Sequence, residues 1–142
     1  MNESMRQNTN SSFKQIINKR RNDIDKLIQL DIELKQLKNS ERVENLFLTG
    51  QILAFNIAKY DESKTYFEEI IFKNQSSDYY LQSLFALYTL NLKINNDEYL
   101  NYRDKIIADY PNSDFAKYII NFENIDIVHL PSKTLNEAEQ LK

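Results

Sequence analysis

The sequence predicts an all-α fold. The chain has 142 residues but only one glycine and two prolines. A β-sheet domain needs turn residues of this kind every eight to twelve positions or so, whereas long helices need few of them. Apolar side chains make up 42 % of the chain. They recur at steps of about three and four, which is typical of helices that bury one face. The length suits a single domain with a hydrophobic core.

The first part of the chain predicts a polar, flexible tail over residues 1–12 and a long helix over residues 13–38. The tail is rich in Asn, Ser and Gln, and it offers no apolar face to bury. The helix carries apolar residues at spacings of three, four and seven. These are Phe13, Ile16, Ile17, Ile24, Leu27, Ile28, Leu34 and Leu37.

Four leucines near the end of this helix alternate steps of three and four, as the a and d positions of a coiled coil do. They are Leu27, Leu30, Leu34 and Leu37. Extending the register backward places Arg20 and Asp23 on the seam, which interrupts it. We therefore expect this helix to pack on the rest of the domain. Pairing with a second chain is the alternative.

Five more helices are expected before residue 123, separated by short polar corners that contain capping residues. The second is expected over residues 42–59, the third opens with Asp61 as its cap, the fourth opens at Asp78, the fifth ends near Asp109 and the sixth starts at Asn112. Gly50 and Ala54 are four residues apart and share a face of the second helix, so a neighbouring helix is expected to approach closely there.

The last part of the chain, residues 123–142, predicts a loose stretch over residues 126–131 and then a short terminal helix. Thr134 stands three residues before Glu137, which is the spacing of a capping box. Residues 13–142 are therefore expected to form a single helical domain.

An internal repeat joins two of the helix pairs. A shift of 36 residues places Glu62 on Glu98 and Tyr66 on Tyr102, and it also superposes two isoleucine pairs. For the preceding helices a shift of 34 residues places Phe47 on Leu81. A helix-turn-helix unit with a period of about 34 residues is the tetratricopeptide spacing.

Two corners carry the family resemblance. The segment Lys59-Tyr60-Asp61-Glu62-Ser63 resembles the tetratricopeptide turn, which usually reads Gly-Asp-Tyr-Asp-Glu-Ala, and Phe67 stands at the aromatic position of the following helix. The corner Tyr110-Pro111-Asn112-Ser113 resembles junctions in the repeats of bacterial cell-envelope proteins. The similarity covers residues 41–122. It departs from the pattern at Ala58, which replaces the turn glycine, and at Arg103, which replaces an aromatic residue.

The resemblance implies an α-solenoid of about two stacked antiparallel helix hairpins, with the long N-terminal and short C-terminal helices as caps. It also implies a non-enzymatic adaptor or scaffold that binds a protein or peptide, in an envelope, assembly or translocation system. The family's inward-facing positions would line the groove for that partner. Mapped onto this chain they are Asn45, Leu48, Ile52, Phe55, Asn56, Tyr79, Gln82, Ala86, Thr89 and Leu90.

The alternative function is that of a structural subunit, which would use the coiled-coil-like N-terminal helix to join a larger complex. Under either reading we expect a monomer or a weak dimer.

The composition argues against an enzyme. The chain has no cysteine and one histidine, His129, which has no nucleophile or carboxylate at a useful spacing. A phosphate-binding loop or dinucleotide fingerprint needs several glycines close together, and a zinc site needs Cys or His ligands. We therefore expect no catalytic residues, no cofactor and no metal.

Charge and hydropathy limit the class of partner. The formal net charge is −3, so nucleic acid is not expected, because it usually requires a basic face. No apolar run is long enough to span a membrane. Lys19, Arg20 and Arg21 form a basic patch that would allow peripheral contact with an anionic membrane. No signal peptide is visible in the polar first residues, and the sequence leaves the compartment open. The resemblance favours a periplasmic or membrane-associated soluble domain over a cytoplasmic one.

Overall fold

The computed structural model describes residues 2–36 and 40–125, and these confirm the all-α prediction. Helices contain 82 % of the described residues, and no strand occurs among them. The elements are α1 (Glu3–Leu34), α2 (Ser40–Gln51), the π-helix η1 (Ile52–Asn56), α3 (Tyr60–Lys73), α4 (Tyr79–Lys93), α5 (Tyr99–Asp109) and α6 (Asp114–Glu123).

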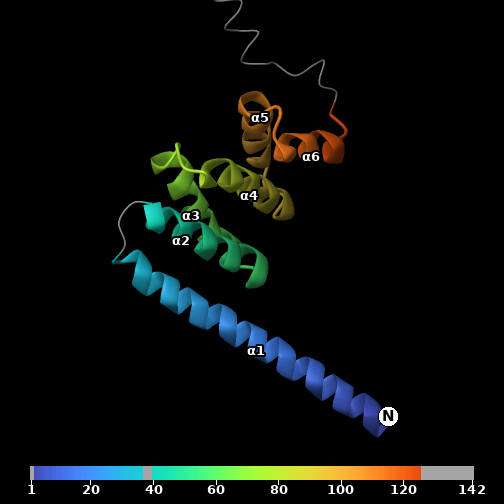
Figure 1. Ribbon diagram of the computed structural model, residues 1–142. Helices are drawn as coiled ribbons and strands as arrows, with labels where there is room; N and C mark the ends of the chain where they lie inside the picture. The colour runs from blue at the N-terminus through green and yellow to red at the C-terminus, as the bar shows by residue number, and fades with distance from the viewer. Residues whose placement is uncertain (1, 37–39, 126–142) are drawn as a thin grey trace, which may run out of the picture.

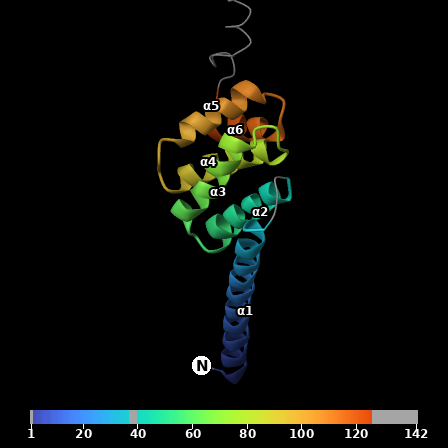
Figure 2. The same cartoon turned by 90° about the vertical axis from the view of Figure 1, so that its left-hand side faces the viewer.

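The molecule consists of a helical body and a rod (Figure 1). Helices α2 to α6 form the body, in which each helix packs against the next along the chain and α2 also contacts α4. Helix α1 is the rod. It touches the body through α2 and η1, and its N-terminal end points away from α5 and α6 (Figure 2).

The rod begins earlier than the sequence pattern predicts. Helix α1 starts at Glu3, so residues 3–12 are helical where a flexible tail is expected. No glycine or proline occurs before Gly50, so nothing in the sequence stops the helix from extending. The Thr9 side-chain hydroxyl donates to the Met5 carbonyl oxygen at 2.7 Å within this stretch. The helix also ends earlier, at Leu34.

The core has two parts that meet at α4. One lies between α2, α3 and α4 and is built around Phe67, Ile70 and Leu87, which are fully buried. The other lies between α4, α5 and α6 and includes Tyr88 and Ile106. Because α4 has core on two sides, it buries more residues than any other described helix.

Gly50 allows α2 and α3 to approach closely, as its small size predicts. A Cβ atom at this position would lie 2.8 Å from Cζ of the buried Phe67 ring. Ala54, on the same face one turn further, is 1 % exposed. The prediction of a tight helix contact at Gly50 and Ala54 is therefore confirmed.

The expected helix 42–59 does not continue as a regular α-helix. After Gln51 the chain widens into η1, and Ile57 N–H donates to the Ile52 carbonyl five residues back at 3.1 Å. The turn that follows passes through Ala58, whose φ of 61° lies in the left-handed region. This region is costly for a residue with a Cβ, which is why glycine is usual there.

The capping predictions have mixed outcomes. Ser113 caps α6, since its Oγ accepts a hydrogen bond from the Ala116 amide at 3.1 Å. The helix therefore starts at Asp114, two residues later than predicted. Asp61 does not cap α3, because Lys59 occupies the N-cap position and Asp61 lies in the first turn. Asp78 precedes α4, but the Tyr79 amide donates to Ser77 Oγ.

The predictions for residues 126–131, for the capping box at Thr134 and Glu137, for the terminal helix and for His129 lie outside the described residues.

Candidate interaction surface

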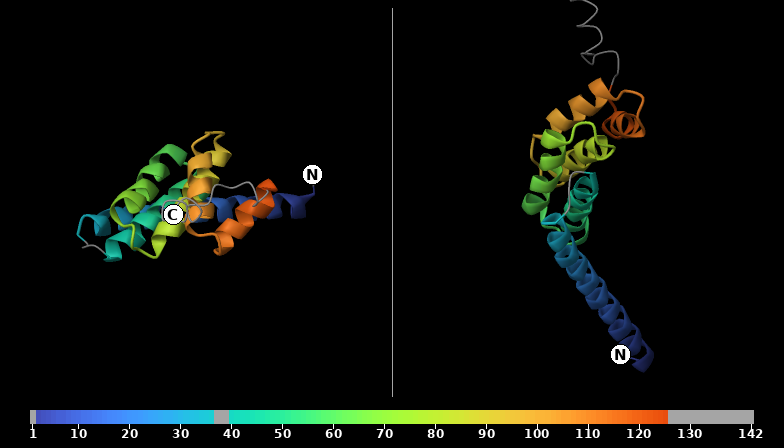
Figure 3. Two further views of the ribbon diagram at one scale, coloured as in Figure 1. Left: turned by 90° about the horizontal axis from the view of Figure 1, so that it is seen from above. Right: turned by 60° about the vertical axis from the view of Figure 1, so that its left-hand side comes forward.

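Helix α1 has a docked part and a free part. From Arg20 onward its side chains reach α2 and η1, whereas every residue from 3 to 19 is exposed to solvent. Leu30 is fully buried at the docked face, and Leu34 packs against the core beside it. Residues 3–19 extend into solvent beyond the body (Figure 3). The expectation that the leucine-rich end packs on the domain is thus confirmed.

A polar contact ends the docked part on its N-terminal side. Arg20 Nη1 donates to the Asn56 carbonyl oxygen at 2.6 Å, and Asn56 Nδ2 donates to Asp23 Oδ1 at 3.1 Å. The last carbonyls of a helix lack partners within that helix. The Arg20 guanidinium supplies such a hydrogen-bond partner to the carbonyl of Asn56, the last residue of η1. The two residues that interrupt the coiled-coil register therefore contribute to attaching α1 to the body.

A second polar contact lies near the end of α1. Asn45 Nδ2 donates to Glu33 Oε2 at 2.8 Å, and Arg42 Nη1 donates to the Leu34 carbonyl oxygen at 2.6 Å. Arg42 also forms an ion pair with Glu69 of α3 at 3.1 Å. Hydrogen bonds from Gln29 and then Asn45 lower the pKa of Glu33, because they favour its charged form. These contacts fix the orientation of α1 on α2.

The groove positions expected on the first helix pair lie largely under α1. Asn45 and Asn56 both donate to carboxylates of α1, so they are occupied within the chain. Leu48 and Ile52 are half-buried, and only Phe55 is widely exposed, at 50 %.

The positions expected on the second pair are mostly committed to the fold. Ala86 and Leu90 belong to the buried core, and the Tyr79 ring lies 5.1 Å from the Phe47 ring between centroids. Thr89 Oγ1 donates to the Phe85 carbonyl at 2.7 Å, and Gln82 Nε2 reaches the Asp78 carbonyl at 3.4 Å. The structure therefore does not bring the ten predicted residues together as one open groove.

Four exposed apolar side chains form a row on α1, which we call the α1 row. At about 100° per residue, its members fall within a sector of about 60°. They are Phe13 at 62 % exposure, Ile17 at 44 %, Ile24 at 51 % and Ile28 at 56 %. The spacing of these residues in the sequence identifies them as one face of a helix. It also predicts that this face is buried, whereas the structure leaves it exposed.

A second apolar patch covers the outer side of α4 and α6. The Phe85 and Phe115 rings are 4.6 Å apart between centroids, and Tyr118 stacks on Phe122 at 5.7 Å. Tyr118 and Phe122 are 50 % and 63 % exposed. Next to them the Tyr88 hydroxyl donates to Glu123 Oε1 at 3.0 Å. Burial, aided by this carboxylate, raises the pKa of Tyr88.

Arg103, which stands where the repeat pattern expects an aromatic residue, is held by an ion pair. Its Nη1 lies 3.1 Å from Glu123 Oε2, and its Nε lies 2.8 Å from Asp104 Oδ1. The first of these contacts joins α5 to the end of α6.

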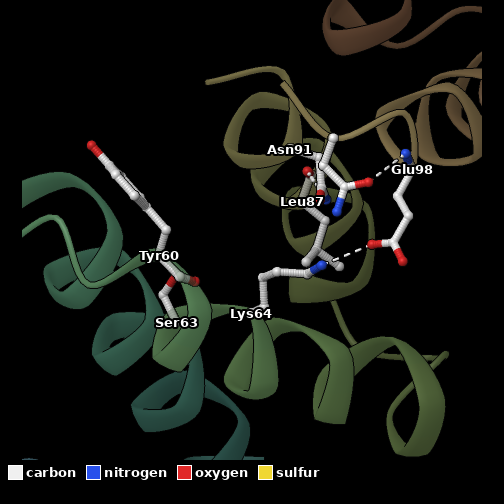
Figure 4. Close-up of polar contacts among 7 residues, drawn as sticks. Tyr60, Ser63, Lys64, Leu87, Asn91 and Glu98 are labelled. Carbon is white, nitrogen blue, oxygen red and sulfur yellow. Dashed lines mark hydrogen bonds and ion pairs between the residues drawn. The ribbon is translucent and has the colours of Figure 1, made fainter. Parts of the chain in front are cut away.

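A group of polar contacts lies within α3, within α4 and between α3 and Glu98, the residue before α5 (Figure 4). Lys64 Nζ lies 2.7 Å from Glu98 Oε2, and the fully buried Asn91 donates through Nδ2 to the Leu87 carbonyl at 2.7 Å. Ser63 Oγ donates to the Tyr60 carbonyl at 2.8 Å. All of these contacts join backbone and side chains within the fold, so we assign the cluster a structural role.

Two absences apply to the described residues. No group of three or more His, Cys, Asp or Glu side chains there could hold a metal ion. None of the helices in the same part of the chain is long and apolar enough to cross a membrane.

Comparison of the chain with known protein families, with curated proteins and with solved structures finds no match.

Proposed function

We propose that this protein is a non-enzymatic protein–protein interaction module whose binding element is the α1 row. The observation that carries the proposal is the exposure of four large apolar side chains on one face of a helix that projects from its domain. Large apolar side chains gathered on one exposed face of a helix are a feature of interaction sites. Burial of that surface against a partner would supply the driving force, at about 25 cal/mol per Å² of apolar area.

In this proposal the long N-terminal helix makes the contact with the partner, as it does in the structural-subunit alternative. A tetratricopeptide-like adaptor that holds a peptide in its groove is the other mode. That mode needs the side chains of Asn45 and Asn56 to be available to a ligand. Both of them donate hydrogen bonds to carboxylates of α1. The packing of each body helix against the next is what a stacked array requires. The envelope setting rests on the resemblance at residues 59–63 and 110–113 alone.

The proposal is tested by charging the row. The variant Ile24→Lys/Ile28→Lys places two cations in it, and burying them on a partner would be costly. The matched control is Asn18→Lys/Asn22→Lys, which adds the same charges at the same spacing on another exposed face of α1. Both variants should keep the wild-type circular dichroism spectrum, because none of the four residues is buried.

Each tagged variant is then used to capture proteins from the native organism. We expect the wild type and the control to retain partners that the row variant loses. Equal capture by all three would refute a binding role for the row.

A further inference from the structure

We infer that the partner of the α1 row is the same row of a second copy of this chain, paired antiparallel. The inference rests on the proposed function, and it names the occupant. The four row residues are separated by intervals of four, seven and four residues, which read the same from either end. The centre of this pattern lies between Arg20 and Arg21. In an antiparallel pair, Phe13 would therefore lie opposite Ile28 of the second copy, and Ile17 opposite Ile24.

The charges of α1 favour the antiparallel direction. In this register residues 22–34, which have four acidic residues and one basic residue, lie along residues 7–19 of the second copy, which have two basic residues, Lys14 and Lys19, and no acidic residue. An antiparallel pair therefore places Lys14 and Lys19 along the acidic segment of the other copy, while Arg20 lies opposite Arg21 at the centre, where the like charges weaken the pair. A parallel pair would place like charges together. The acidic half would also oppose binding along an anionic membrane.

One pair of charges makes this complementarity specific. Lys14 and Asp25 are both exposed and lie at the same edge of the row, on the side away from the docked face. In the antiparallel register, Asp25 of the second copy is two residues out of step with Lys14. This is about 3 Å along the helix axis, within reach of a lysine side chain. Symmetry produces the contact twice.

The body leaves room for a second helix. The body contacts one face of α1, and the centre of the row lies about 110° around the helix from the centre of that face. The residues of the contacted face are Arg20, Asp23, Leu30, Glu33 and Leu34. The body therefore leaves the row uncovered, as the exposure of Ile24 and Ile28 within the docked part of α1 shows. Four side chains from each copy bury less than the roughly 1,200–2,000 Å² of a stable complex. We expect a weak, concentration-dependent dimer.

The chain contains no cysteine, so introduced cysteines report the pairing without background. We would prepare Ile17→Cys and Ile24→Cys as separate proteins and oxidise each alone and as a mixture. A disulfide needs Cα atoms within about 7 Å. In the antiparallel pair, Ile17 faces Ile24, whereas two Ile17 positions are offset by seven residues, about 10 Å. The mixture should form a cross-linked dimer, and neither protein should do so alone.

Sedimentation of the native sequence from micromolar to millimolar concentration measures the association directly. Ile24→Lys/Ile28→Lys should remain monomeric, and the control Asn18→Lys/Asn22→Lys should associate like wild type. Lys14→Glu and Asp25→Lys should each raise the dimer Kd by about two- to thirtyfold, for two exposed ion pairs. The double exchange Lys14→Glu/Asp25→Lys should restore it.

Cross-linking of either cysteine variant alone would overturn the antiparallel assignment. A monomer throughout the concentration range would overturn the self-pairing, and so would row-dependent binding of that monomer to phosphatidylserine vesicles. If the monomer captured a different protein through its row, the proposed function would stand without this inference. If the row variant captured the same proteins as wild type and both stayed monomeric in sedimentation, both would fall.

Discussion

Arg20 and Asn56 are 36 positions apart, yet the guanidinium of one donates to the backbone carbonyl of the other at 2.6 Å. This contact joins the middle of the rod to the last residue of the π-helix. A π-helix that continued as α-helix would use that carbonyl internally. The irregular end of the second helix thus creates the acceptor that positions α1.

Weakening the docking contacts should release α1 without unfolding the body. Asn45→Ala and Asn56→Ala each remove a hydrogen bond to an α1 carboxylate, worth about 0.5–1.5 kcal/mol. We expect the double variant to increase amide hydrogen exchange in residues 20–34, with little change in α4. Gln82→Ala is the control, because its contact lies within α4 and its approach to the Asp78 carbonyl is long. Unchanged exchange in α1 would show that the leucines alone hold it.

Gly50→Ala should destabilise the fold. Alanine is the better helix former by about 1 kcal/mol, but its Cβ would meet a buried ring. Overpacking in a well-filled core costs about 1–3 kcal/mol, so the steric effect should exceed the propensity gain. Urea denaturation would measure the difference. Phe67→Leu makes room at the same place. We therefore expect Gly50→Ala to cost less in that background, and an equal cost in both would contradict the contact.

Ala58→Gly should stabilise the protein by about 0.5–1 kcal/mol. The alanine occupies the left-handed region, where an L-residue pays about 1–2 kcal/mol, and the gain is reduced by the greater freedom of glycine in the unfolded chain. The control Ala108→Gly lies inside α5 and should destabilise instead. Thermal melts of the two variants should shift in opposite directions. A lower melting temperature for Ala58→Gly would refute the backbone conformation.

The free energy of unfolding should fall at high pH because the Tyr102 phenol is half-buried. Burial raises the pKa of this phenol to about 12, and the carboxylates of Glu68 and Glu98 add to the shift. Since the unfolded chain ionises near pH 10, it loses its proton first. The contribution is therefore fully present below about pH 10 and is lost as the pH rises toward 12.

Absorbance at 295 nm follows the ionisation directly. Tyr102→Phe should remove one late-titrating phenol from the folded protein, and the difference from wild type should vanish in denaturant. A folded Tyr102→Phe protein with an unchanged late phase would show that the phenol is not protected as described.

The sequence predicts the helices well where apolar period and corner chemistry agree. The α6 cap at Ser113 and the close contact at Gly50 both follow from local rules that tertiary structure does not override. Element ends are less predictable. Nothing in the polar residues 3–12 marks them as helix, since only the absence of a breaker lets α1 continue. The π-helix η1, which begins at Ile52, also has no distinct pattern in the local sequence.

The interaction surface could be predicted only in part. The three- and four-residue spacing of apolar side chains identifies Ile17 and Ile24 as part of one helix face. It does not determine which of two adjacent faces the body covers. That choice depends on Arg20 and Asp23, whose bonds to Asn56 turn the leucine face inward. The mapping of Asn45 and Asn56 to a groove takes no account of α1, whose carboxylates accept hydrogen bonds from both side chains. Such long-range pairings are not encoded in spacing.

Helix α6, which carries Tyr118 and Phe122, lies at the end of the molecule away from the N-terminal end of α1 (Figures 1 and 2). Occupying the α1 row therefore leaves the aromatic patch of these two residues accessible. A pair of chains joined through α1 would display the aromatic patch twice, with a fixed separation set by the rods. A ligand with two matching sites would then gain avidity without any new contact, provided its own spacing fits that separation. In such a pair the length of α1 would set the distance between the two aromatic patches.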